Sequence, residues 1–274
     1  MWRIMTRRFL VVGAHPDDCD LRFGGTAIKL AQAGHEVKFV SLTNGNCGHY
    51  SMKGDELAKR RYQEAQNSKK YNMVCEYEVW NISDCTLTAS LENRERLIRT
   101  IRRFAPDVVL SHRLCDYHAD HRNTAQLVLD SAYLVKVPMY LSDTPIPDNE
   151  PVFAYFFDEF TDPRPCHNDA IVSIDDVMEQ KCKALDCHVS QFYEWLPKDR
   201  NYAVPPYRDD NWPERYAHLL EYWGERYVKC ANGSRPLLNE IYGSDGASVK
   251  YAEAFEFSPY GRRVTMKEFR ELFL

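Results

Sequence analysis

The chain has 274 residues, of which 44% are hydrophobic and 13% aromatic, enough for one large globular domain with a sizeable core. Its net charge of −5 and pI near 6.0 argue against binding to nucleic acid or to an anionic membrane surface. No run reaches 18 consecutive apolar residues, and residues 1–8 lack the apolar core of a signal peptide. We therefore expect a cytoplasmic protein without a membrane span, whose partners are small molecules.

Short apolar runs alternate with helical patterns along the first half of the chain. The predicted strands are 9–12, 36–42, 75–80 and 108–111. The predicted helices are 23–34, 55–71, 91–104 and 121–137. This alternation predicts an α/β fold, with a mostly parallel sheet and helices on both faces.

The second half is less regular. Its predicted strands are 152–157 and 170–174, its predicted helices are 175–196 and 212–228, and a mixed tail follows. Two proline-rich segments, Pro138 to Pro151 and Pro197 to Pro213, are predicted as loops at the carboxyl edge of the sheet, where specificity for a substrate is built. We expect a single domain, 1–274, in which 1–137 carries the motifs and 138–274 completes the sheet and the substrate-side loops.

Polar clusters follow two of the predicted strands. The first strand runs into Ala14-His-Pro-Asp-Asp-Cys-Asp20, and the strand at 108–111 runs into the segment 112–123, which carries three histidines and two aspartates. The carboxyl ends of parallel strands lie at one edge of a sheet, and ligands bind there at the point where the strand order reverses. We therefore expect the two clusters to meet.

The first cluster calls for a cation, because its three carboxylates repel one another. His15 and Asp18 can reach one ion, and a third ligand from the second cluster would leave the open position that catalytic zinc keeps for water. Asp17 could then take a proton from the attacking water. His118 is the candidate to stabilise an oxyanion or to protonate a leaving nitrogen.

Five motifs occur in a defined order. They are Ala14-His-Pro-Asp-Asp18, Gly24-Gly-Thr26, Gly34-His35, Thr43-Asn-Gly45 and His118-Ala-Asp-His121. Together they resemble the PIG-L (LmbE-like) N-acetylglucosaminyl deacetylases. The resemblance implies a Rossmann-like fold and zinc-dependent removal of an N-acetyl group from an N-acetylated amino sugar or glycoconjugate.

The resemblance also assigns roles to residues. It implies that His15, Asp18 and His121 bind Zn²⁺, or another divalent ion such as Fe²⁺. Asp17 would be the general base and His118 the oxyanion-side residue, with Asp120 as its neighbour in the motif.

Two further positions resemble substrate contacts of the family, Arg61 and Asp84. Arg61 could equally lie on a solvated helix face beside Glu64, and Asp84 could be a turn residue. The chain departs from the family pattern at Asp20, where glutamate is more usual, and at Asn46, where glutamate is common.

Other functions fit the sequence less well. A nucleotide-binding dehydrogenase would need a G-x-G-x-x-G motif after the first strand, and the aspartates there would repel a pyrophosphate. A metal-dependent hydrolase of another amide or of a phosphoester remains an alternative, as does a non-catalytic carbohydrate-binding relative. The sequence leaves open the native metal, the role of His112 and whether the chain forms a homo-oligomer.

The cysteines point to a reducing compartment. There are nine of them, an odd number without a C-x-x-C pair. Cys19 and Cys115 lie inside the polar clusters, but we favour buried filler residues over thiolate ligands at both.

Overall fold

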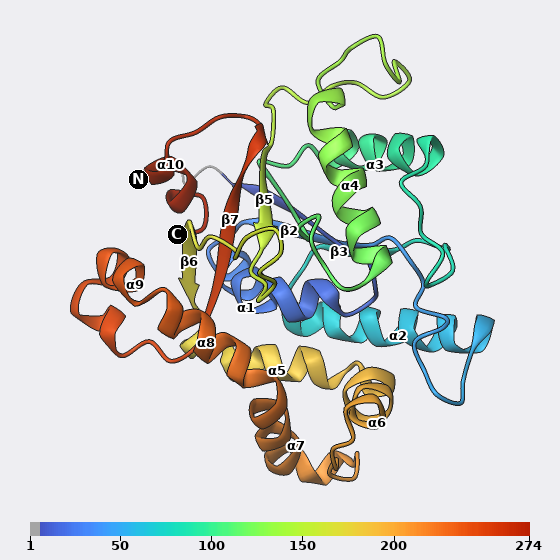
Figure 1. Cartoon of the computed structure of the whole chain (residues 1–274), viewed down its shortest axis with the longest axis vertical. Coiled ribbons are helices and arrows are strands. Elements are labelled where there is room, and N and C mark those ends of the chain that lie inside the picture. The colour runs from blue at the N-terminus through green and yellow to red at the C-terminus, as the bar shows by residue number, and fades with distance from the viewer. Residues whose placement is uncertain (1–5) are drawn as a thin grey trace.

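The computed structural model describes residues 6–274, which contain a seven-stranded sheet in the order β3-β2-β1-β4-β5-β7-β6 (Figure 1). The strands are β1 (Arg8–Gly13), β2 (Glu36–Ser41), β3 (Glu76–Val79), β4 (Val108–Ser111), β5 (Val152–Phe156), β6 (Ala170–Ser173) and β7 (Ala252–Gly261). The helices are α1 (Asp18–Gln32), α2 (Gly54–Asn72), α3 (Leu91–Phe104), α4 (Ala119–Leu134), α5 (Met178–Asp186), α6 (Leu196–Arg200), α7 (Trp212–Leu219), α8 (Glu225–Gly233), α9 (Arg235–Tyr242) and α10 (Met266–Glu271).

The sheet is mostly parallel, as the sequence predicts. Strands β1 to β5 pair in parallel, whereas β7 is antiparallel to both β5 and β6. The strand order reverses between β1 and β4, because β1 lies between β2, on one side, and β4, on the other. The carboxyl ends of β1 and β4 therefore form the expected ligand-binding edge.

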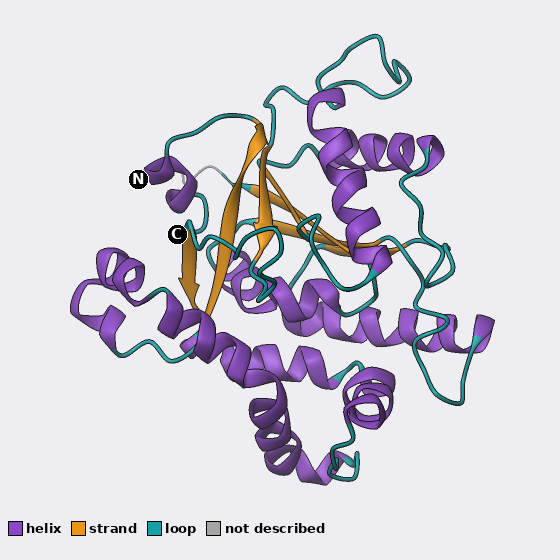
Figure 2. Ribbon diagram, viewed as in Figure 1, coloured by secondary structure: helices purple, strands orange, loops and turns teal. Residues whose placement is uncertain are grey.

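Helices cover both faces of the sheet, with α3 and α4 on one face and α1, α2 and α5 on the other (Figure 2). Strand β1 is buried by both layers. Its Phe9 and Val11 pack on the α1 side, and Leu10 and Val12 pack against the α3 and α4 side, all four with no exposed surface. Burial on both faces explains why the strand reads as an unbroken apolar run.

The tail contains a strand that the sequence analysis missed. In β7, Glu253 and Glu256 interrupt the apolar pattern, yet both are buried. Glu253 lies 2.8 Å from Nζ of the buried Lys181 and accepts hydrogen bonds from the backbone nitrogens of Gly25 and Thr26. Tertiary partners thus make acidic residues acceptable in an internal strand.

The predicted helix 175–196 is wrong as a continuous element. The segment starts with a 3₁₀ turn, Asp175–Val177, and α5 ends at Asp186. The chain then forms a π-helical turn, Ser190–Trp195, that leads into α6. A second π-helical turn, Leu220–Gly224, separates α7 from α8 within the predicted helix 212–228.

The placement of the loop 138–151 was also predicted wrongly. Arg102, near the end of α3, donates to the carbonyls of Leu141 and Thr144, and the nitrogen of Val152 bonds to the carbonyl of Asp107, just before β4. The loop therefore lies at the amino edge, at the far end of α4 (Figure 1). A crossover helix that leaves the carboxyl edge ends at the amino edge, where the next parallel strand must begin.

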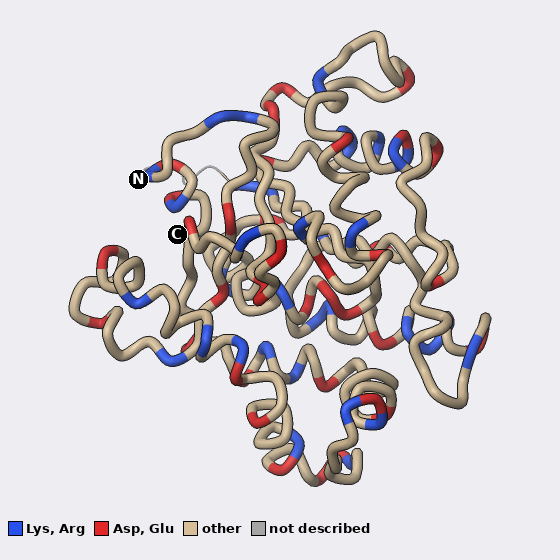
Figure 3. The backbone as a smooth tube through the Cα atoms, viewed as in Figure 1, with Lys and Arg blue, Asp and Glu red and all other residues tan. Residues whose placement is uncertain are grey.

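Within residues 6–274, no helix has both the length and the apolar character that a membrane crossing requires. Acidic and basic residues are both spread over the described chain (Figure 3). Residues 1–5, on which part of the signal-peptide prediction rests, lie outside the described range.

Candidate active site

The turn between β1 and α1 is closed by Asp18, the first residue of α1. Its Oδ2 accepts hydrogen bonds from the backbone nitrogens of Ala14, at 2.9 Å, and His15, at 2.8 Å. A Cβ atom at Gly13 would lie 2.7 Å from Cβ of Asp18, so this close approach requires glycine. The turn thus holds Asp18 through one oxygen, and the other, Oδ1, lies 3.4 Å from Nε2 of His121.

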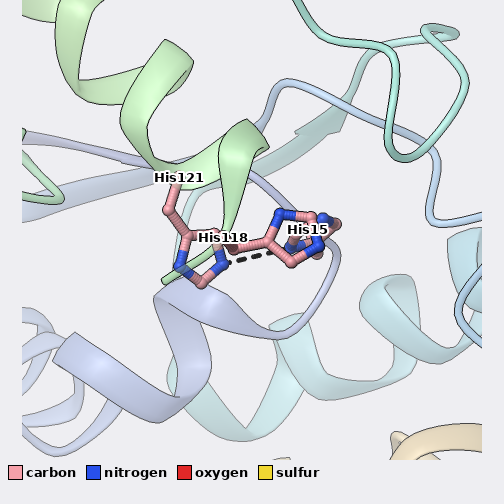
Figure 4. Close-up of side chains that lie close together, drawn as sticks. All are labelled: His15, His118 and His121. Carbon is pink, nitrogen blue, oxygen red and sulfur yellow. Dashed lines mark hydrogen bonds between the residues drawn. The ribbon is translucent and has the colours of Figure 1, made fainter. Parts of the chain in front are cut away.

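The two polar clusters meet, as the sequence analysis expects. His15 Nδ1 lies 3.2 Å from His121 Nε2 (Figure 4) and 3.5 Å from Oδ2 of Asp18. A tetrahedral zinc ion about 2.0–2.1 Å from each ligand atom would separate those atoms by roughly 3.3 Å. The three side chains therefore have the spacing expected of three ligands of one tetrahedral ion.

The other nitrogen of each imidazole faces a carboxylate. His15 Nε2 lies 3.1 Å from Asp84 and 3.4 Å from Asp120, and His121 Nδ1 lies 3.0 Å from Asp116. In the tautomers that place a proton on each of these nitrogens, His15 Nδ1 and His121 Nε2 are the nitrogens left to bind a cation. Carboxylates behind metal-binding histidines orient them in this way. The donor set therefore fits a divalent cation.

The charges around the centre agree with this interpretation. Burial opposes the charged form of His15, but hydrogen bonds to Asp120, Asp18 and Asp84 raise its pKa well above the usual value. Burial likewise opposes ionisation of Asp18, but His121 and His112 hold its pKa well below the usual range. The carboxylates around His15 favour a positive charge at this point, which a proton or a metal ion can supply.

Asp17 points away from the turn that Asp18 closes. Its Oδ2 lies 3.1 Å from Nη2 of Arg61, and its side chain lines the pocket beside the metal-ligand candidates. The two adjacent carboxylates thus have different surroundings, as the division between base and ligand requires. A buried cation at Arg61 fixes the direction of the Asp17 carboxylate.

Arg61 itself is packed against the loop after β2. It is 2% exposed and donates to the carbonyl of Gly45. A Cβ atom at Gly45 would lie 2.4 Å from the Arg61 guanidinium, and the φ of Gly45 is +67°, so the Thr43-Asn-Gly45 motif needs glycine at this point. The solvated-helix alternative for Arg61 is therefore wrong.

His118 caps the first turn of α4. Its Nδ1 accepts a hydrogen bond from the backbone nitrogen of Asp120, at 3.1 Å. Burial and the neighbouring His15 and His121 lower the pKa of His118. The neutral ring therefore carries its proton on Nε2, and it faces His15 edge-on with 4.6 Å between ring centroids. Such a ring can donate a hydrogen bond to an oxyanion in the pocket.

Asp84 and Asp120 lie beside His15, and of the two only Asp84 lines the pocket. Asp84 is 3% exposed, and Asp120, which has no exposed surface, also accepts hydrogen bonds from the backbone nitrogens of Cys85 and Leu87. Both carboxylates hold His15. For Asp120 this geometry favours a positioning role over direct participation in the reaction.

Two residues of the site received no role from the sequence. Asp116 orients His121, and its position five residues before His121 in the second cluster is the signal that could have identified it. His112 stacks on His121, with 4.1 Å between ring centroids, and its Nε2 lies 3.4 Å from Asp18. Burial and His121 lower the pKa of His112 to about 4, so His112 is neutral.

Asp20 and the cysteines of the clusters lie apart from the proposed ligands. Asp20 is fully buried, accepts a hydrogen bond from the Tyr77 hydroxyl and lies 3.2 Å from His188, so it links α1 to the core. Burial raises the pKa of the Cys19 thiol, whose Sγ contacts the carbonyls of Val11 and Val40. Cys115 is only partly buried, and its thiol is free. Among the described residues, neither the Cys19 nor the Cys115 thiol lies in a group of three or more His, Cys, Asp or Glu side chains close enough to share one metal ion.

A pocket of about 440 Å³ opens over these residues. Its floor comes from the first half of the chain and contains His15, Asp17, Asp18, Arg61, Asp84, His118 and His121. Its opposite wall comes from α6, α8 and the two π-helical turns and contains Phe192, Trp195, Leu196, Asp199, Arg200, Trp223 and Arg226. The start of the segment 197–213 therefore lines the site, and the loop 138–151 does not.

Comparison with known proteins confirms the resemblance to the PIG-L family. The PIG-L model, described as GlcNAc-PI de-N-acetylase, matches residues 10–132. Diacetylchitobiose deacetylase from Thermococcus kodakarensis is 29% identical over 208 residues, which cover 72% of this chain and 77% of that enzyme. The structure of N,N'-diacetylchitobiose deacetylase from Pyrococcus horikoshii matches with a TM-score of 0.69 at 27% identity and covers 93% of this chain and 85% of that one.

The relatives also include a protein with another activity. The 4-oxalmesaconate hydratase from Pseudomonas putida is 27% identical over 195 residues, which cover 68% of this chain and 74% of that enzyme. Residues 10–132 of the chain thus resemble the PIG-L (LmbE-like) family, and the similar proteins include a deacetylase and a hydratase.

Proposed function

We propose that this chain, as a member of the PIG-L family, is a zinc-dependent hydrolase that removes the N-acetyl group from an N-acetylglucosamine-type sugar or glycoconjugate. The observation that carries the proposal is the convergence of His15 Nδ1, His121 Nε2 and the Asp18 carboxylate, 3.2–3.5 Å apart, beneath a pocket that also holds Asp17 and His118. The similarity to diacetylchitobiose deacetylase supports the choice of bond and of substrate class.

His15, Asp18 and His121 would hold the ion. When bound, zinc lowers the pKa of a coordinated water towards neutrality and polarises a carbonyl group. Asp17 takes the proton of the attacking water, because its carboxylate faces the pocket and Arg61 fixes its direction. His118 donates its Nε2 proton in a hydrogen bond to the oxyanion that forms at the acetyl carbon.

The remaining assigned residues support this arrangement. Asp84, Asp116 and Asp120 keep the ligand imidazoles in the tautomers that metal binding requires. Arg61 holds Asp17, and both Arg61 and Asp84 line the pocket, where they can also contact the sugar.

Metal analysis and acetate release test the proposal together. The purified protein should contain about one zinc per chain and release acetate from N-acetylglucosamine or diacetylchitobiose. His15→Ala, Asp18→Ala and His121→Ala should each lose the metal and the activity, whereas His167→Ala, at an exposed histidine, should lose neither. Full metal occupancy in all three ligand variants would contradict the assignment of the centre.

A second candidate function is hydration of an unsaturated carboxylate, which the similarity to 4-oxalmesaconate hydratase favours. Both reactions begin with attack by an activated water, and they differ in the acceptor carbon. Loss of the ultraviolet absorbance of a conjugated enoate, without any acetate release from the sugars, would select the hydratase.

A further inference from the structure

The pocket is lined by four arginines, of which only Arg61 has a carboxylate partner there. Arg61 pairs with Asp17. For Arg22, Arg200 and Arg226, no carboxylate oxygen among residues 6–274 lies within 4.0 Å of a guanidinium nitrogen. Arg22 and Arg226 are partly buried, so their unpaired charges are costly there unless a bound anion compensates them.

Arg22 lies next to the metal centre. It follows Asp18 by four residues on α1, so the two side chains leave the same side of the helix, one turn or about 5.4 Å apart along the axis. Nη1 donates to the carbonyl of Phe157, at 2.8 Å, just beyond the carboxyl end of β5, whereas the buried Nε has no partner. One hydrogen bond anchors the guanidinium at the edge of the pocket and leaves other donors for a ligand.

Arg226 faces Arg22 from α8. It is partly buried, and its side chain has no hydrogen-bond partner within the described part of the chain. Burial and the positive charge of Arg22 lower the pKa of Arg226 to about 10. The carboxylate of Glu159 acts on Arg226 through space, but it is exposed and lies 3.4 Å from Lys229.

Arg200 completes the set at the end of α6. Its guanidinium lies over the ring of Trp223, 4.6 Å from the centroid, and this stacking directs an otherwise exposed side chain along the pocket wall. Asp199 is the acidic residue on the same wall, but it is exposed and forms no ion pair with these arginines within the described residues. Segments far apart in the sequence thus bring three cations to one pocket.

We propose that Arg22, Arg200 and Arg226 form an anion subsite, and that the natural substrate carries a carboxylate or phosphate group besides the group that water attacks. The proposal rests on the proposed function to the extent that the metal centre beside Arg22 is the reacting centre. Guanidinium groups bind both kinds of oxyanion through paired N–H donors, and a bound oxyanion would relieve the repulsion between Arg22 and Arg226. A neutral disaccharide would leave that repulsion in place.

Matched sugars test the subsite. N-acetylglucosamine 1-phosphate and N-acetylmuramic acid, which carry a phosphate and a carboxylate, should have higher kcat/KM values than neutral N-acetylglucosamine. In Arg226→Gln and in Arg200→Gln, the ratio of kcat/KM for the better anionic sugar to that for the neutral sugar should fall on the order of 10- to 100-fold. Arg103→Gln removes an exposed cation at the opposite edge of the sheet and should leave the ratio unchanged.

Calorimetric titration with the same three sugars gives a readout that does not depend on turnover. Binding of the anionic sugar should weaken in the pocket variants by a similar factor, and the preference between phosphate and carboxylate identifies the group. Anionic binding that depends on these arginines, without acetate release from any sugar, would support the subsite and overturn the deacetylase function. Acetate release with equal losses on neutral and anionic sugars in the variants would overturn the subsite and leave the deacetylase function intact.

Discussion

The replacement of Asp17 by asparagine separates the general base from the metal ligand. Asparagine is nearly the same size but cannot take a proton. General-base catalysis contributes on the order of 10²–10⁴ in rate, so the transition state should lose about 2.7–5.4 kcal/mol of stabilisation. Asp17 makes no side-chain cap hydrogen bond to α1, and Asp18 is held by the nitrogens of Ala14 and His15. The fold and the metal site should therefore survive the change.

Steady-state acetate release, zinc content and calorimetric binding should be measured on the same preparation of Asp17→Asn. We expect kcat to fall by the stated factor, with zinc content and binding of the sugar close to those of the unchanged protein. Asp18→Asn is the matched comparison, one residue away, and should lose zinc. Zinc loss in Asp17→Asn with retention in Asp18→Asn would exchange the two roles, and full activity of Asp17→Asn would refute the general-base mechanism.

The remaining predictions concern the residues around the centre and one buried ion pair. Asp116→Ala removes the partner of His121 Nδ1 and should lower zinc affinity by roughly 10- to 100-fold in competition with a chelator; an unchanged affinity would exclude an orienting role. His118→Ala should keep zinc but lower kcat on the order of 10²–10³, and a loss of zinc would instead make His118 a ligand. Lys181→Met leaves the Glu253 carboxylate buried without its cation and should lower the free energy of unfolding, measured in denaturant, by about 3–5 kcal/mol. A double variant that also carries Glu253→Gln should recover much of that loss.

The first half of the chain could be predicted from sequence because its local signals agree with the tertiary structure. Strands β1 and β4 contain unbroken apolar runs, and β2 and β3 alternate polar with apolar residues. Helix α3 has the N-cap Ser90, whose side chain accepts from the nitrogen of Asn93, and the left-handed C-cap Ala105. The two clusters come together because parallel strands place their carboxyl ends at one edge, a rule that needs no knowledge of side-chain positions.

The second half could not be predicted as well, because long-range partners determine it. Glu253 in β7 appears incompatible with an internal strand until Lys181 and the nitrogens of α1 are known to contact it. The π-helical turns bring Phe192, Trp195 and Trp223 to the pocket. Each such turn contains an extra residue, which changes the side of the helix on which the following side chains lie. A regular helical period in the sequence cannot show where that extra residue falls.

This division of the chain has a functional consequence. The family model ends at residue 132, so it covers the proposed metal ligands and also Asp17 and His118. It covers none of the opposite pocket wall, whose residues begin at Phe192. The similar proteins include a deacetylase and a hydratase, so similarity at 27–29% identity does not determine the reaction. We therefore expect side chains outside residues 10–132 to contribute to the choice of substrate. In this chain those side chains include Arg200 and Arg226. We therefore expect the pocket to distinguish substrates by their charge.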